Sequence, residues 1–278
     1  MKTIKLKTVI KAKTTFLFLI TLILISVQAC KKNEVVAIPP DYNQPNGSCI
    51  VTQTSDAAGL GVFGDLNFVY DAKGNPLQLN SFVTYSYDTK GRLVKESSSQ
   101  YTLTITYNDE TFLPSATYRR FTSNNALVQT ILYTYDNAGR VIKTNLLYVN
   151  AGVPGEIIWK YNYDAGNNIK TIIDPVSGDT IIKVKSYDNK PNFLGGNQWI
   201  KYILNDPTSG YYPMNYFLFS ANNPVEWSIK DNSGGLIVPV VNAYYAYNNK
   251  GYAVSDSVVF RDPAGDFAGV QTSVFNCH

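Results

Sequence analysis

The chain has 278 residues, with 24 Lys+Arg against 21 Asp+Glu, and 45% of its residues are hydrophobic. Its single histidine, His278, is the last residue, which excludes serine–histidine–aspartate triads, histidine-rich zinc sites and HExxH proteases. The sequence also has no G-x-S-x-G, no phosphate-binding glycine loop and no D-x-[DN]-x-[DN]-G calcium loop. We therefore expect no enzyme, no cofactor and no metal site.

Residues 1–29 have the composition of a secretory signal. Five lysines and no acidic residue stand in the first 13 positions, and residues 14–29 are uncharged and rich in Phe, Leu and Ile. A basic head, a short apolar stretch and a small residue before the cleavage point, here Ala29, are typical of such a signal. The uncharged stretch is shorter than the roughly 20 apolar residues of a membrane-spanning helix.

The signal ends in Val27-Gln28-Ala29-Cys30, which resembles the lipobox of bacterial lipoproteins. The resemblance implies cleavage before Cys30, diacylglycerol on its sulfur and an acylated amino group, so that acyl chains hold the protein on a membrane. The alternative is a plain signal anchor with an incidental cysteine. Lys31 stands where an Asp often retains such proteins at the inner membrane. We therefore expect an outer-membrane lipoprotein, on either the periplasmic or the outer face.

Removing the signal changes the charge of the chain. The precursor has a net charge of +3, but from Cys30 onward there are 19 basic and 21 acidic residues, a net charge of −2. This removes the electrostatic basis for binding nucleic acid. Residues 30–48 have few large apolar side chains and contain Pro39-Pro40, so we expect a lipidated tether ahead of a domain at 49–278.

The domain at 49–278 has the composition of an all-β fold. The chain contains 21 Tyr and 13 Phe, with Thr, Val and Ile throughout, which favours strands. In residues 101–107 apolar residues alternate with threonine, and Trp159 and Tyr161 share a face opposite Lys160. A period of two is typical of a strand with one buried side, as in antiparallel sheets.

One unit recurs along the domain: a strand ending in Tyr-Asp or Tyr-Asn, a short turn with Gly, and a further strand. An Asp or Asn at the first turn position can accept hydrogen bonds from nearby backbone N–H groups, and a Gly three residues later can take a positive φ. The unit therefore predicts a β-hairpin whose Tyr covers the hairpin end. The copy at Tyr163 is shortened, with its glycine at Gly166. The other copies begin at Tyr70, Tyr87, Tyr135 and Tyr247.

The copies at 87–93 and 135–141, with the pattern Y-D-x-x-G-R-[LV], resemble the YD (RHS) repeat. Other copies match it in part, and Tyr187-Asp188 is similar to a variant in uncharacterised Bacteroidetes lipoproteins with β-hairpin repeats. The resemblance covers about residues 65–255. The copies are irregularly spaced, and the chain is too short for the closed shell of RHS toxins. The resemblance thus implies hairpin geometry but not toxin delivery.

These elements predict an antiparallel meander of YD-like hairpins, with about 12–16 strands if strands and loops have ordinary lengths. The sheet is expected to curve strongly or to close, because a flat array would leave long unpaired edges. Residues 195–240 lack the repeat and are strand-like in composition only.

Two cysteines remain once Cys30 is acylated. Cys49 stands in the first strand-like run and Cys277 in the last, and cysteines of exported proteins usually pair. We expect a disulfide that joins the first strand to the last. The alternative is two buried free thiols.

Aromatic residues are densest where the repeat is weakest. Aromatic rings can stack on sugars and form protein-binding faces, so Trp199, Tyr212 and Trp227 are the candidate binding face, with at least two of them exposed and clustered. The alternative for any single aromatic residue is a place in the core.

Three functions remain open. The first is a non-enzymatic cell-envelope lipoprotein that binds a glycan or an envelope protein, and the second is an envelope scaffold component without a small ligand. The third, a glycan-processing enzyme, needs two carboxylates about 5–10 Å apart. No pair stands out among the acidic residues outside the Tyr-Asp turns, which include Asp206, Glu226, Asp231, Asp262 and Asp266.

Overall fold

The computed structural model describes residues 49–56, 66–108, 111–150, 152–192, 199–203, 214–230, 237–261 and 267–277. The chain divides into two units, residues 1–40 and 41–278, and all described residues belong to the second. The expected signal at 1–29 and the tether at 30–48 lie outside the described residues. Within the described ranges, no helix has both the length and the apolar character needed to span a membrane.

Strands make up nearly all of the described chain. Two short helices, α2 (Ile200–Ile203) and the 3-10 helix η1 (Met214–Phe219), stand between β12 and β13. The strands are β1 (Cys49–Asp56), β2 (Leu66–Tyr70), β3 (Pro76–Leu79), β4 (Val83–Tyr87), β5 (Leu93–Ser97), β6 (Tyr101–Tyr107), β7 (Pro114–Phe121), β8 (Leu127–Tyr135), β9 (Val141–Asn150), β10 (Val153–Tyr163), β11 (Ile169–Ile173), β12 (Thr180–Pro191), β13 (Asn222–Lys230), β14 (Ile237–Tyr247), β15 (Ala253–Phe260) and β16 (Phe267–Cys277).

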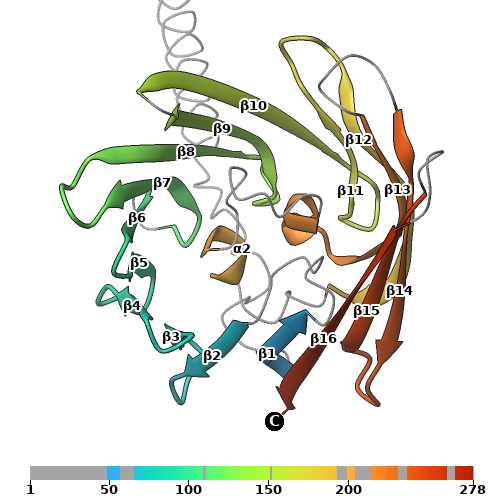
Figure 1. Ribbon diagram of the computed structural model, residues 1–278, viewed down its shortest axis with the longest axis horizontal. Coiled ribbons are helices and arrows are strands. Elements are labelled where there is room, and N and C mark those ends of the chain that lie inside the picture. Colours follow the sequence, from blue (N-terminus) through green and yellow to red (C-terminus); the bar gives the residue numbers. More distant parts are fainter. Residues whose placement is uncertain are drawn as a thin grey trace, which may run out of the picture. The chain divides into compact units, whose positions relative to one another are not determined.

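Each strand pairs antiparallel with its neighbours in the chain, which confirms the predicted all-β meander (Figure 1). β1 also pairs with β16, so the order of hydrogen-bonded strands is that of a closed barrel. The two pairings of β1 are unequal. β1 and β16 are paired from Cys49 opposite Cys277 to Asp56 opposite Gln271, whereas the described part of β2 pairs with β1 at two positions. Closure therefore depends most on the β1–β16 ladder.

The core lies on one face of the sheet, as the alternation predicts. In β6, Leu103 and Ile105 are buried and Thr104 between them is exposed, and in β10 Trp159 and Tyr161 are buried. The opposite face, called here the exposed face, is largely polar. Its exposed residues include Thr84, Lys95, Thr104, Lys160, Lys170 and Lys183.

Between β12 and β13, α2 and η1 lie on the core side of the sheet, where α2 is surrounded by strands (Figure 1). The Trp199 ring meets the Tyr107 ring edge-on at 6.2 Å, and the Tyr202 ring meets the Tyr133 ring edge-on at 5.3 Å. The strand-like reading of this segment is wrong over α2 and η1. Helices of four to six residues are too short to show a helical period in the sequence.

Candidate functional site

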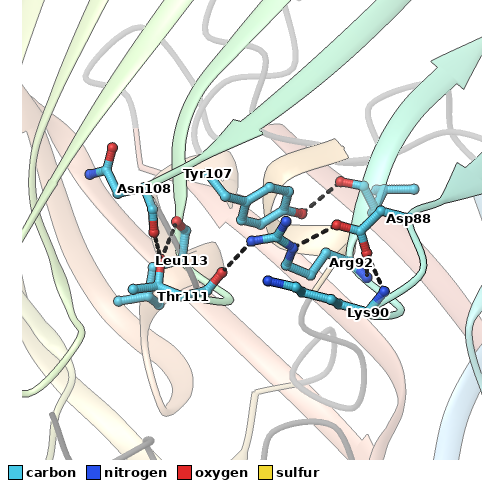
Figure 2. Close-up of polar contacts among 8 residues, drawn as sticks. Asp88, Lys90, Arg92, Tyr107, Asn108, Thr111 and Leu113 are labelled. Carbon is cyan, nitrogen blue, oxygen red and sulfur yellow. Dashed lines mark hydrogen bonds and ion pairs between the residues drawn. The ribbon is translucent and has the colours of Figure 1, made fainter. Parts of the chain in front are cut away.

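The Tyr-Asp turns form as the motif predicts. In the turn after β4, Asp88 Oδ1 accepts hydrogen bonds from the backbone N–H groups of Lys90 and Arg92, both at 2.9 Å (Figure 2). Gly91 has a φ of 79°, the left-handed conformation that favours glycine. The same pair of side-chain-to-backbone hydrogen bonds is made by Asp71, Asp136 and Asn248.

The copy at Tyr163 is not shortened, contrary to the prediction. Asn167, with a φ of 63°, takes the position that Gly166 was expected to hold, and its N–H donates to the Asp164 carbonyl at 3.2 Å. Asn168 N–H then donates to Asp164 Oδ1 at 2.9 Å, as in the other turns. The turn keeps its full length because Asn tolerates the left-handed region better than most residues with a Cβ.

The arginine of the motif connects each hairpin to the next. Arg92 Nε donates to Asp88 Oδ2 at 2.7 Å within its own turn, and Nη1 donates to the Thr111 carbonyl at 3.1 Å (Figure 2). Its guanidinium carbon lies 4.6 Å from the centre of the Tyr107 ring, on the following hairpin. Only a planar group with several donors satisfies these contacts at once. Arg140 repeats the arrangement with Asp136, Asn167 and Tyr163.

Tyrosines near the strand end before a turn bond to the preceding hairpin, which the sequence did not reveal. Most belong to the motif, but Tyr107 and Tyr245 do not, and the motif residue Tyr247 donates to the Asp188 carboxylate instead. Tyr107 O–H at the end of β6 donates to the carbonyl of Leu93, the first residue of β5, at 2.6 Å. We call such contacts inter-hairpin tyrosine bonds, because each one ties two successive hairpins. The others, at 2.6–2.8 Å, run from Tyr70 to Val51, Tyr87 to Pro76, Tyr135 to Pro114, Tyr163 to Val141, Tyr187 to Ile169 and Tyr245 to Pro224.

Burial and hydrogen bonding set the charge of the motif residues. Burial acts to raise the pKa of Asp88, but hydrogen bonds from the Arg92 backbone and guanidinium outweigh it, and the pKa lies below its ordinary value. Burial raises the pKa of Tyr107 and Tyr135 far above 10. At neutral pH the turn carboxylate is thus an ionised acceptor and the tyrosine hydroxyl a protonated donor, as their hydrogen bonds require.

The candidate binding face is wrong for two of its three residues. Trp199 and Trp227 keep only 2% and 1% of their surface exposed, and Tyr212 lies outside the described residues. Trp227 packs edge-on against Phe217 of η1, with 5.1 Å between the ring centres. These rings are buried because Trp199 and η1 pack on the core side of the sheet, where large rings remove most apolar area from water.

Of the acidic residues weighed for catalysis, the structure describes Glu226 alone. Its Oε1 lies 2.7 Å from Nζ of the exposed Lys185, an ion pair between β13 and β12. Across the described ranges, no three His, Cys, Asp or Glu side chains are grouped so that they could hold a metal ion.

The exposed face changes character over β8, β9 and β10. Leu132, Leu147 and Val149 are 40%, 40% and 47% exposed there, and large apolar side chains are also exposed on other strands, such as Val69 of β2 and Val240 of β14. Pro154 is the register partner of Val149, and Ile158 follows on β10, two rungs further along the same face. We call these five residues the β8–β10 apolar patch.

A pair of lysines borders this patch. Lys143 of β9 and Lys160 of β10 are direct register partners, one rung of the exposed face beyond Ile158. Like charges directly opposite one another on neighbouring strands are destabilising. Neither lysine forms an ion pair with any described acidic residue. The two ammonium groups therefore add a positive edge to the apolar patch.

Comparisons with known proteins give structural likenesses only. No protein-family model matches the sequence, and a comparison with curated proteins finds no match. A porin-like protein from Bacteroides vulgatus is similar over 82% of this chain and 99% of its own, with 14% identity and a TM-score of 0.42. One from Bacteroides uniformis is similar over 81% and 98%, with 13% identity and a TM-score of 0.43.

A chain of the Photorhabdus luminescens Tc holotoxin pore is similar over 74% of this chain but 13% of its own, with 14% identity and a TM-score of 0.29. All three TM-scores lie below 0.5, so the function is argued from the residues of this chain.

Proposed function

We propose that this chain is a non-enzymatic cell-envelope lipoprotein whose β-domain binds a protein partner through the β8–β10 apolar patch. The patch is the observation that supports the proposal, because apolar side chains gather there on three neighbouring strands, with Asn145 and Glu156 between them, and gathered exposed apolar side chains mark interaction sites. The location rests on the sequence. A signal at 1–29 exports the chain, and lipid on Cys30 holds it at the outer membrane.

The size and charge of the patch favour a particular kind of partner. Five side chains are far fewer than the roughly 20–30 residues that each partner contributes to a stable complex. This favours a transient contact with another protein over a permanent dimer. Lys143 and Lys160 favour a partner whose apolar centre has carboxylates at its edge, since these would relieve the repulsion between the lysines.

The glycan alternative has lost its main support. It rested on exposed aromatic platforms, and the two tryptophans chosen for that role are core residues. A glycan array on the isolated domain addresses it directly: binding that depends on an exposed aromatic residue such as Tyr244 would restore the glycan alternative and weaken the protein-binding one.

Position-specific photo-crosslinking in intact cells tests the proposed surface. A photoreactive residue in place of Leu147 is expected to give a covalent adduct of defined mass, whereas one in place of Thr104, on the exposed face of β6, gives none. Leu132→Thr and Val149→Thr in the Leu147-probe background should each reduce the adduct, because threonine suits an exposed strand but removes apolar area. Lys143→Glu should reduce it further.

Three outcomes contradict the proposal. Equal adducts at both probe positions would mean that the crosslinks are unspecific. An adduct with the mass of two copies of this chain would replace the separate partner by self-association. A Leu147 adduct that survives the threonine substitutions would place the contact elsewhere.

The lipoprotein part has its own test. Cys30→Ala should abolish labelling by a fatty-acid analogue and release the protein from membranes, because the acyl chains provide the anchor. Cys49→Ala is the matched control and should leave both the labelling and the membrane attachment unchanged. A Cys30→Ala protein that is still labelled and membrane-bound contradicts the lipobox assignment.

A second candidate function is an envelope scaffold without a small ligand. The inter-hairpin tyrosine bonds favour it, since they tie successive hairpins along most of the sheet and suit a rigid structural element. Detergent sensitivity of the cells separates the two candidates. If deletion of the protein raises sensitivity and the patch variants do not, the scaffold function is preferred.

A further inference from the structure

The first and last strands bring two cysteines into register. Cys49 of β1 is the direct partner of Cys277 of β16, and the register continues without a shift to Val51 opposite Phe275. Directly opposed residues of antiparallel strands have Cα atoms about 4.5 or 5.5 Å apart, depending on the hydrogen-bonding type of the pair. A disulfide needs about 4.4–6.8 Å between the Cα atoms, so both types of pair meet the requirement.

We propose that Cys49 and Cys277 form an intrachain disulfide that closes the ring of strands covalently. The proposal rests on the export in the proposed function, because disulfides persist in oxidising compartments. Each thiol loses one proton and one electron. The two electrons pass by thiol–disulfide exchange to a disulfide-bearing oxidoreductase, which leaves as a dithiol. Cys30 does not compete, because the transfer of diacylglycerol to its sulfur makes that sulfur a thioether.

The position of the bond determines what it does. Cys49 begins β1 and Cys277 ends β16, so the bond holds together one end of the β1–β16 ladder. This is the ladder on which closure of the ring of strands most depends. Strand ends near chain termini fray unless they are held. The linked residues enclose nearly the whole domain, and a crosslink that closes a long loop restricts the unfolded chain most. The disulfide thus keeps the terminal strands together even when the short β1–β2 pairing opens.

Thiol counting on the protein taken from cells tests the bond. The membrane-bound protein is blocked with an alkylating agent, denatured, and treated with a maleimide-linked polymer before or after reduction. The wild type should take up no polymer when the polymer is added before reduction. When the polymer is added after reduction, the wild type should take up two polymers per chain. Reduction should lower its melting temperature by about 10 °C. Peptide mass spectrometry should show the Cys49 peptide linked to the Cys277 peptide.

The matched variant is Cys49→Ser, which should leave one alkylated thiol without any reduction. Two thiols alkylated in the unreduced wild type overturn the proposal, whether or not the variant folds. If the disulfide is absent in cells, treating the purified, reduced protein with oxidised glutathione shows whether the geometry or the compartment prevents it. Failure to form the bond there contradicts the geometric inference. Formation there but not in cells contradicts the export, while the crosslinking test of the patch remains independent.

Discussion

Each inter-hairpin tyrosine bond joins two successive hairpins, so removal of its hydroxyl should weaken the contact between them. Tyr107→Phe deletes the donor to the Leu93 carbonyl and leaves the ring under Arg92. A buried acceptor that loses its partner costs about 1–3 kcal/mol. We expect the free energy of unfolding to fall by that amount in urea titrations, with little change of the m-value.

Tyr85→Phe is the matched control. Tyr85 is also buried, in β4, but its hydroxyl has no hydrogen-bond partner among the described residues. Removing an unpartnered buried hydroxyl costs nothing and relieves its desolvation, so this variant should be as stable as the wild type or slightly more stable. If both variants lose the same stability, the effect comes from the aromatic packing and not from the inter-hairpin bond.

Gly91 should be replaceable by some residues and not by others. Its φ of 79° lies in the left-handed region, and a Cβ at this position meets no atom within 4 Å. Gly91→Val is therefore expected to cost about 1–2 kcal/mol of stability from backbone strain alone. Gly91→Asn should cost less, because Asn167 holds the equivalent position two copies later, in the β10–β11 turn. A denaturant midpoint that is highest for the wild type, lower for Gly91→Asn and lowest for Gly91→Val supports a left-handed backbone at Gly91. Equal midpoints for the two variants contradict it.

Single residues differ in how far the sequence could predict them. The Asp and Gly of the turn were predictable because their partners are backbone groups within four residues. The tyrosine and arginine partners were not, since Leu93 and Thr111 are fixed by the register of neighbouring hairpins. The Asn167 substitution for glycine was missed because Gly166 beside it offered a simpler but incorrect alignment.

Among the elements, α2 and η1 carry core residues, so truncation there should destabilise the whole sheet. Trp199→Ala removes a ring packed against Tyr107 and Phe112. Large-to-small changes of this kind cost about 3–5 kcal/mol. Tyr244→Ala, on a side chain that is 56% exposed, should change the melting temperature little. A stable Trp199→Ala protein would mean that the segment before β13 is dispensable for the core.

Strands were predictable from their period of two, whereas the apolar patch and the buried insertion were not. Ile131 and Leu132 are adjacent and both apolar, so the sequence does not tell which one faces the core; the register with β7 and β9 decides it. The aromatic run before β13 was taken for a surface because it departs from the repeat. Rings that fill the core side of a curved sheet have the same composition as rings that bind a ligand.

For the molecule as a whole, buried tyrosines should set the upper pH limit of stability. Burial raises the pKa of eleven tyrosines above the ordinary value near 10: Tyr70, Tyr85, Tyr87, Tyr107, Tyr135, Tyr161, Tyr163, Tyr187, Tyr202, Tyr245 and Tyr247. Above pH 10 the unfolded chain loses these protons and the folded chain keeps them. Because the unfolded state then binds fewer protons, stability falls as the pH rises.

Lys201 acts in the opposite direction over a lower range. Burial lowers its pKa to about 8 from the ordinary 10.5. Between these values the folded chain binds fewer protons than the unfolded chain, so stability rises slightly with pH. One lysine cannot offset the tyrosines, and the net profile should be a shallow rise above pH 8 followed by a steep fall above pH 10.

The steepness of that fall is the measurable consequence. Each buried tyrosine costs about 1.4 kcal/mol per pH unit above pH 10, and a domain is stable by about 5–15 kcal/mol, so five tyrosines suffice to unfold it within about two pH units. The chain has 21 tyrosines, of which these are eleven, so the tyrosinate absorbance of the eleven should appear as a steep step that coincides with the loss of the circular dichroism signal of the sheet. A rise of tyrosinate absorbance to the level of all tyrosines with the sheet signal intact would show that the buried hydroxyls exchange with water in the folded state, and the inter-hairpin tyrosine bonds could then not be the buried contacts that hold the hairpins together.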